Sequence, residues 1–224
     1  GMILISEKEK FFDPRKPFQS ARPETHEEWQ ARMGGEVLAV VRSGLYLDFR
    51  FLDMALSALT PTPDERCGVL ATDGRILCYQ PTALLRLYQE NPKYLNRLCL
   101  HTLFHCIFRH LWLRGRRDRR LWDLACDIAV ENVIDGLGRK SVTRPLTYVR
   151  RQAYDAIAAE GRVVAAAPAY RWLLTLTPGV LRQLEREFYT DDHRLWPKDA
   201  PEQPQQMPTP LPQKTWQKIG ERMQ

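Results

Sequence analysis

The hydrophobic pattern is densest between residues 98 and 114, where the chain reads LCLHTLFHCIFRHLWLR. Apolar residues occupy nearly every face of the helix that this stretch would form, and no Pro or Gly interrupts it. A helix that is apolar nearly all round is a buried one. The pattern therefore predicts a buried central helix that starts near Asn91-Pro92 and runs to about Arg114.

The rest of the pattern predicts a mostly helical chain with one short stretch of strands. Helical spacing and breaker residues predict further helices over about residues 24–41, 49–59, 81–87, 121–135, 151–159, 168–176 and 178–188. Between residues 67 and 79 two short apolar runs flank Thr72-Asp73-Gly74, and Asp-Gly suits a tight hairpin turn. The expected fold class is α+β, mostly helical, with a small antiparallel β-hairpin.

Proline-rich ends mark the expected domain boundaries. Residues 1–23 are mixed in character and predict an irregular N-terminal arm, and residues 24–196 form the expected domain. Residues 197–212 are rich in Pro, which is a linker composition. Residues 213–224 predict the start of a further helix or a following domain that is cut short.

Composition limits the class of protein. Hydrophobic residues make up 44% of the 224 residues, which supports a packed core. The five cysteines are odd in number and form no C-x-x-C pair, so neither a disulfide framework nor a thiolate zinc site is indicated. No apolar run reaches the roughly 18 residues that a membrane span needs. We expect a cytoplasmic protein with buried free thiols and no membrane contact.

The net charge of +6 permits an acidic partner without requiring one. Much of the excess comes from five arginines between residues 114 and 120. A solvated turn between two helices explains them more simply than nucleic-acid binding, which would need a larger patch with aromatic stacking residues.

Two histidines in the central helix are the candidate chemistry. His101 and His105 are four residues apart, so their side chains project within about 40° of each other, one turn apart. This is the geometry of the H-E-x-x-H zinc motif. The motif reads HTLFH here, and Thr102 stands where the glutamate would be. His110 is about 180° round the helix from His101, which excludes it as a ligand unless the helix distorts.

Two acidic residues in the next helix complete the candidate site. If the helices around residues 98–114 and 121–135 form an antiparallel pair, Asp127 lies level with His105 and Glu131 level with His101. Their neighbours are apolar, and a buried carboxylate must be paired or bound to metal. The pattern supports two interpretations: a His₂-carboxylate zinc site with an open fourth position, or a metal-free His–Asp hydrogen-bond network that locks the helix pair. Glu131 could support a ligand or serve as an alternative one, and His193 could fold back in either role.

Five segments carry a resemblance to a known family. They are ATDGRILCYQP (71–81), HTLFHCIFRH (101–110), LWDLACDIAVEN (121–132), AAPAYRWLLTL (166–176) and DDHRLW (191–196). Together they resemble the bacterial metallopeptidase domain of zincin type that usually precedes a von Willebrand factor A-like domain. The resemblance implies a zincin-like helix pair and a cytoplasmic zinc-peptidase-like domain, often encoded beside an AAA+ ATPase, with His101, His105 and Asp127 at the family's metal positions.

Two departures from the family pattern bear on activity. Thr102 replaces the motif glutamate that serves as general base, and Glu131 stands where the family usually has asparagine. A zinc hydrolase needs both a metal-activated water and a base, and threonine cannot take a proton near neutral pH. We therefore expect a metallopeptidase-like domain that binds zinc but is catalytically impaired. The alternative is a non-enzymatic scaffold without metal that works with the ATPase.

Overall fold

A computed structural model describes residues 22–160, 163–198 and 211–223. The predicted N-terminal arm and Pro-rich linker fall almost entirely outside these residues. The described part is mostly helical with one small sheet, so the predicted α+β class is confirmed. Within it, no helix is both long and apolar enough to cross a bilayer.

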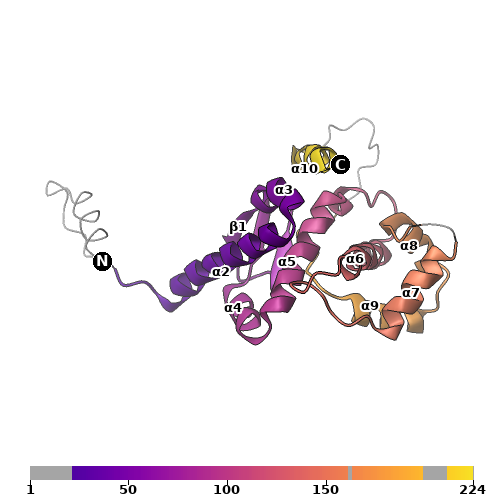
Figure 1. Ribbon diagram of the computed structural model, residues 1–224, viewed down its shortest axis with the longest axis horizontal. Coiled ribbons are helices and arrows are strands. Elements are labelled where there is room, and N and C mark those ends of the chain that lie inside the picture. The colour runs from indigo at the N-terminus through magenta and orange to yellow at the C-terminus, as the bar shows by residue number, and fades with distance from the viewer. Residues whose placement is uncertain (1–21, 161–162, 199–210, 224) are drawn as a thin grey trace.

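The helices and strands follow the predicted order with shifted ends. The helices are α2 (His26–Asp48), η1 (Arg50–Leu52), α3 (Asp53–Ala58), α4 (Pro81–Glu90), α5 (Pro92–Ile107), η2 (His110–Trp112), α6 (Arg119–Asp135), α7 (Tyr148–Ala158), α8 (Ala166–Leu173), α9 (Pro178–Phe188) and α10 (Leu211–Met223). The strands are β1 (Thr60–Pro63), β2 (Leu70–Thr72) and β3 (Ile76–Tyr79). In Figure 1, α5 runs through the middle, with α2, α3, α4 and β1 on one side and α6 to α9 on the other.

The sheet contains the predicted hairpin and one strand that we did not predict. β2 and β3 pair antiparallel, and Gly74 between them has a φ of +95°, which favours glycine. β1 pairs parallel with β3 on its other side, giving the order β1-β3-β2. Pro61 and Pro63 suggested only a helix stop, but proline is tolerated on an edge strand because that strand needs hydrogen bonds along one side alone.

α2 continues past residue 41, where the sequence predicted its end, runs through Ser43-Gly44 and ends at Asp48. Its inward face buries Val37, Leu38, Val41 and Leu45, and this burial outweighs the roughly 1 kcal/mol that each helical glycine costs. Gly34 is needed for packing, since a Cβ there would lie 2.6 Å from the Tyr79 ring.

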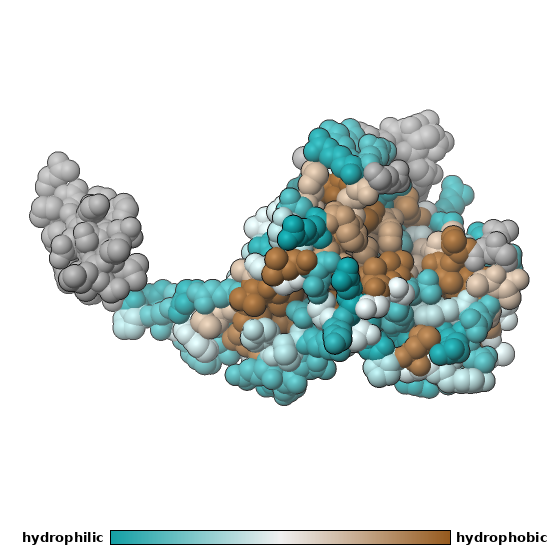
Figure 2. Space-filling model, in the orientation of Figure 1, coloured by the Kyte–Doolittle hydropathy of each residue, from teal (hydrophilic) through white to brown (hydrophobic). Residues whose placement is uncertain are grey.

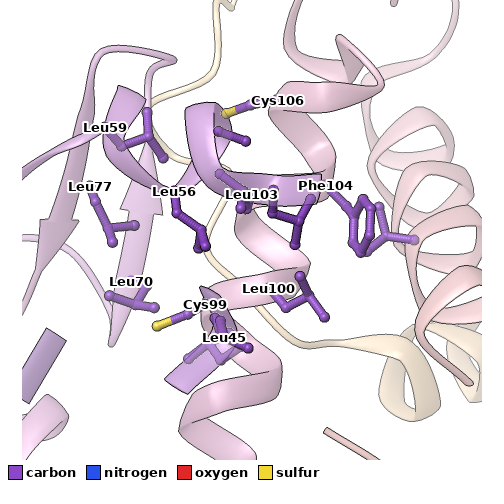
Figure 3. Close-up of a cluster of buried hydrophobic side chains, with 14 of the residues drawn as sticks. Leu45, Leu56, Leu59, Leu70, Leu77, Cys99, Leu100, Leu103, Phe104 and Cys106 are labelled. Atoms are coloured by element: carbon purple, nitrogen blue, oxygen red, sulfur yellow. The ribbon is translucent and has the colours of Figure 1, made fainter. Parts of the chain in front are cut away.

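α5 is buried on two opposite faces, which explains its apolar sequence. Figure 3 shows Cys99, Leu103 and Cys106 facing side chains of α2, α3 and the sheet, including Leu45, Leu56 and Leu77. His101 and His105 face α6 instead. A second cluster of buried side chains packs α6 against α7, α8 and α9. The histidines therefore lie between the two halves of the core.

α10 packs on this core rather than standing apart from it. Trp216 is fully buried, and its Nε1 donates to the Gly74 carbonyl at 2.7 Å. Ile219 is also buried. In Figure 2 the outer surface of α10 is hydrophilic, whereas hydrophobic residues gather over α2 and beside α5.

Candidate metal centre

His101 and His105 extend from the same face of α5, as predicted. Both side chains are completely buried, their ring centroids are 4.6 Å apart, and their Nε2 atoms are 2.9 Å apart. Asn91 starts this helix by accepting a hydrogen bond from the Tyr94 backbone N–H, and Pro92 follows at its first position. The helix therefore aims two imidazole nitrogens at one point.

Asp127 of α6 meets both histidines at that point. Its Oδ1 lies 3.0 Å from the Nε2 of His101 and 3.0 Å from the Nε2 of His105, and the residue is buried. The sequence placed Asp127 level with His105 across the helix pair, and here it lies beside both histidines. The same alignment of α5 with α6 places Glu131 beside His101, also as predicted.

The segment after α9 adds two more donors, and sequence reasoning missed one of them. Asp191 Oδ1 lies 3.0 Å from His101 Nε2 and 3.4 Å from His105 Nε2. His193 Nε2 lies 2.8 Å from Asp191 Oδ1 and 3.1 Å from Asp127 Oδ1. Asp192 holds this segment against the sheet by accepting a hydrogen bond from the Gly68 N–H. The DDH sequence was the available signal, but nothing in it distinguished Asp191 from Asp192.

Five donor atoms thus converge, and their chemistry suits a metal ion. They come from His101, His105, Asp127, Asp191 and His193, and all lie within 4.8 Å of one another. Nitrogen and oxygen ligands at about 2.0–2.2 Å from zinc would lie roughly 3 Å from their neighbours, close to the observed spacing. The second oxygen of Asp191 is buried and has no hydrogen-bond partner in the described part of the chain. These residues could hold a metal ion.

Each histidine is oriented through its other ring nitrogen. His101 Nδ1 lies 2.8 Å from Glu131 Oε2, His105 Nδ1 lies 3.0 Å from His110 Nδ1, and His193 Nδ1 lies 3.2 Å from Asp123 Oδ1. A partner at Nδ1 fixes the ring and leaves the Nε2 lone pair for a metal. Glu131 orients His101 in this way, which is the supporting role that the sequence predicted for it.

His110 reaches the site because α5 ends earlier than predicted. The helix stops at Ile107, Arg109 adopts a left-handed conformation with a φ of +60°, and η2 begins at His110. The sequence excluded His110 as a ligand on the assumption of a regular helix to about Arg114. The prediction of that long helix is wrong. His110 contacts His105 without joining the five converging donors.

The charges of the cluster stabilise one another. Burial opposes ionisation of Asp127 and Asp191, yet the neighbouring histidines hold the pKa of both carboxyls well below the usual range. Burial also disfavours the charged form of His101 and His193, but the surrounding carboxylates raise the pKa of both imidazoles. The pKa of His110 is lowered by burial and by His105. The site is thus a concentrated anionic environment that attracts either protons or a cation.

Thr102 takes no part in this convergence. It is completely buried, and its hydroxyl donates to the Leu98 carbonyl of its own helix at 2.9 Å. Thr102 stands where the motif glutamate would be, but it contributes none of the converging donors. Hydrogen bonding of Thr to the carbonyl four residues earlier is a common alternative inside helices, and it commits the only proton that Thr102 can donate.

The site is covered. Trp196 stacks on His193 with ring centroids 3.7 Å apart and also packs edge-on against His105. The side chains of His101 and His105 are 0% exposed, and that of His193 is 8% exposed. The sequence predicted two histidines, one carboxylate and an open fourth position, whereas Asp191 and His193 bring two further donors to the same point.

A family model described as "Putative metallopeptidase domain" matches residues 42–169. The matched stretch includes His101, His105 and Asp127 and ends before Asp191 and His193. No curated protein and no solved structure matches the chain.

Proposed function

This chain belongs to the metallopeptidase domain family identified by that match, and on this premise we propose that it binds a divalent metal ion without acting as a peptidase. The ligands are His101, His105, Asp127, Asp191 and His193. The observation that carries the proposal is the convergence of these five donors, with each histidine held at Nδ1 by a separate partner. Imidazole and carboxylate donors without thiolate suit zinc and other first-row divalent ions, and zinc is the ion to test first.

Charge balance in the core supports a divalent ion. The side chains counted are at most 10% exposed: the carboxylates of Asp127, Glu131, Asp135 and Asp191, and the guanidinium groups of Arg97 and Arg150. With neutral histidines, four negative charges face two positive ones. Buried charge is costly unless it is compensated, and a divalent cation supplies the missing two charges.

Two observations support the absence of peptidase activity. The position of the general base is a threonine whose hydroxyl is bonded to its own helix, and losing a general base typically costs about 10²–10⁴-fold in rate. A catalytic zinc polarises a carbonyl or activates a bound water, and either needs an open position that substrate can reach. Here Asp191 and Trp196 occupy the space around the histidines. The metal's role is then to join α5, α6 and the segment after α9.

The second candidate is a metal-free scaffold. It is favoured by the hydrogen bonds between the histidines and the carboxylates, which pair these groups when no metal is bound. In that case the same residues lock the helix pair through protons. The two candidates make opposite predictions for metal content and for the effect of a chelator.

Metal analysis of the purified chain separates them. We expect about one divalent ion per chain by elemental mass spectrometry, with a lower melting temperature after chelation that added zinc restores. His101→Ala combined with His105→Ala should abolish binding. A chain that binds none of zinc, manganese, iron(II) or cobalt, and whose melting temperature ignores the chelator, establishes the scaffold instead.

A protease assay tests the second half of the proposal. The unmodified chain should not cleave unstructured protein substrates, and Thr102→Glu should not create activity, because position 102 is completely buried and the site is covered. Chelator-sensitive cleavage by the unmodified chain would show that the site opens and that catalysis persists without the motif glutamate.

The cytoplasmic location, the AAA+ ATPase partner and a following von Willebrand factor A-like domain stay predictions from the sequence. Affinity purification of the full-length protein from its native cell, followed by mass spectrometry, tests the partner directly.

A further inference from the structure

A second buried cluster of charges lies directly behind the metal centre. It consists of Arg97, Glu131, Asp135 and Arg150, from α5, α6 and α7. Arg97 and Arg150 are among the most deeply buried charged residues of the described chain, at 2% and 0% exposure. Burying arginine requires strong compensation, so a cluster like this needs an explanation.

Glu131 connects the two clusters through its two oxygens. Oε2 accepts a hydrogen bond from His101 Nδ1 at 2.8 Å. Oε1 accepts from Arg97 Nε and Nη2 at 3.2 and 3.1 Å and from Arg150 Nη1 at 2.9 Å. One carboxylate therefore touches a metal ligand on one side and two guanidinium groups on the other.

The two arginines are themselves fixed. Arg97 also donates to the Val142 carbonyl at 2.9 Å, and both arginines donate to Asp135. The Arg150 guanidinium lies 4.8 Å from the centre of the Phe188 ring and donates through Nε to Glu187. Planar guanidinium groups held at several points leave the Glu131 carboxylate one orientation.

We propose that Arg97 and Arg150 are positioning residues for the metal centre, acting through Glu131. They aim Oε2 at Nδ1 of His101, so that this nitrogen carries the proton and Nε2 presents its lone pair to the ion. This inference rests on the proposed metal binding. It also implies that the docking of α7 and α9 on α6 affects metal affinity, because Arg150 lies on α7 and its partner Glu187 lies on α9.

Arg150→Met tests the proposal, with Arg144→Met as the matched control. The Arg144 side chain is 30% exposed and pairs with Glu187 at 3.6 Å, and it forms no hydrogen bond or ion pair with Glu131 among the described residues. Removing a direct partner of a ligating histidine typically weakens metal binding about 10–100-fold, and Arg150 acts one contact further out, through Glu131. We expect zinc affinity, measured by competition with a chromophoric chelator, to fall about 10-fold, the lower limit of that range, in Arg150→Met and to stay unchanged in Arg144→Met.

A second readout does not depend on the variant folding. In the zinc-loaded unmodified chain, ¹⁵N spectra of the histidine side chains should show the His101 proton on Nδ1 and zinc at Nε2. A proton on Nε2 overturns the proposal, as does Arg150→Met binding zinc with unchanged affinity. An unmodified chain that binds none of zinc, manganese, iron(II) or cobalt overturns this inference together with the proposed function, whereas metal binding with an insensitive Arg150 overturns the inference alone.

Discussion

Replacing Asp191 with Asn should separate the metal-binding contribution of this segment from its structural one. Asparagine keeps the size of the side chain and one carbonyl oxygen but removes the negative charge. Asp191 lies within 3.4 Å of the Nε2 atoms of all three histidines, and its side chain is 1% exposed. Its charge therefore acts on the ion with little screening by water.

The size of the effect follows from linkage. Changing a group that only supports a metal ligand typically costs about 10–100-fold in affinity, so we take about 100-fold as the effect of Asp191→Asn. At free zinc about 100 times the original dissociation constant, binding stabilises the folded chain by about 2.7 kcal/mol. After a 100-fold loss of affinity, binding at the same zinc concentration stabilises the folded chain by only about 0.4 kcal/mol. The difference, about 2.3 kcal/mol, corresponds to a melting temperature lower by roughly 5–9 °C for a chain of this size.

Thermal unfolding with zinc and with chelator measures this quantity. The decisive value is the zinc-dependent shift of each variant, because removing a carboxylate from the metal-free site also changes its charge repulsion. Asp192→Asn is the matched control: the Asp192 side chain binds the backbone N–H groups of Gly68 and Arg194 and is not among the converging donors. Equal zinc shifts in both variants would refute Asp191 as a ligand.

Three further predictions test the surroundings of the site. Thr102→Val should lower stability by about 1 kcal/mol, since it removes one buried hydrogen bond, and leave zinc affinity unchanged; a change in affinity would place the hydroxyl at the metal. Trp216→Ala should destabilise the chain to urea by about 3–5 kcal/mol, because the side chain is fully buried, whereas no effect would mean that α10 is dispensable for the fold. All five cysteines are buried, and burial raises the pKa of the Cys67 and Cys78 thiols. A thiol reagent should therefore label the folded chain very slowly and the denatured chain at five sites. Rapid labelling of the folded chain would contradict the buried placement.

The helical pair and its inward residues were predictable from the sequence. Hydrophobic periodicity and breaker residues act locally, so they predicted α5, α6 and the hairpin. They also placed Asp127 and Glu131 level with His105 and His101, because the rise of a helix is regular and the connecting turn is short. The family resemblance rested on the same local motifs and is confirmed by the match over residues 42–169.

The residues that complete the site depend on the packing of distant segments. Asp191 lies 90 positions after His101 in sequence, and its approach depends on how α7, α8 and α9 pack on α6. No local pattern encodes that packing. The left-handed turn at Arg109, which brings His110 behind His105, is likewise invisible in an apolar run with helical spacing. The geometry of α5 and α6 determines where His101, His105 and Asp127 point. Long-range packing of the core brings Asp191 and His193 to the same point.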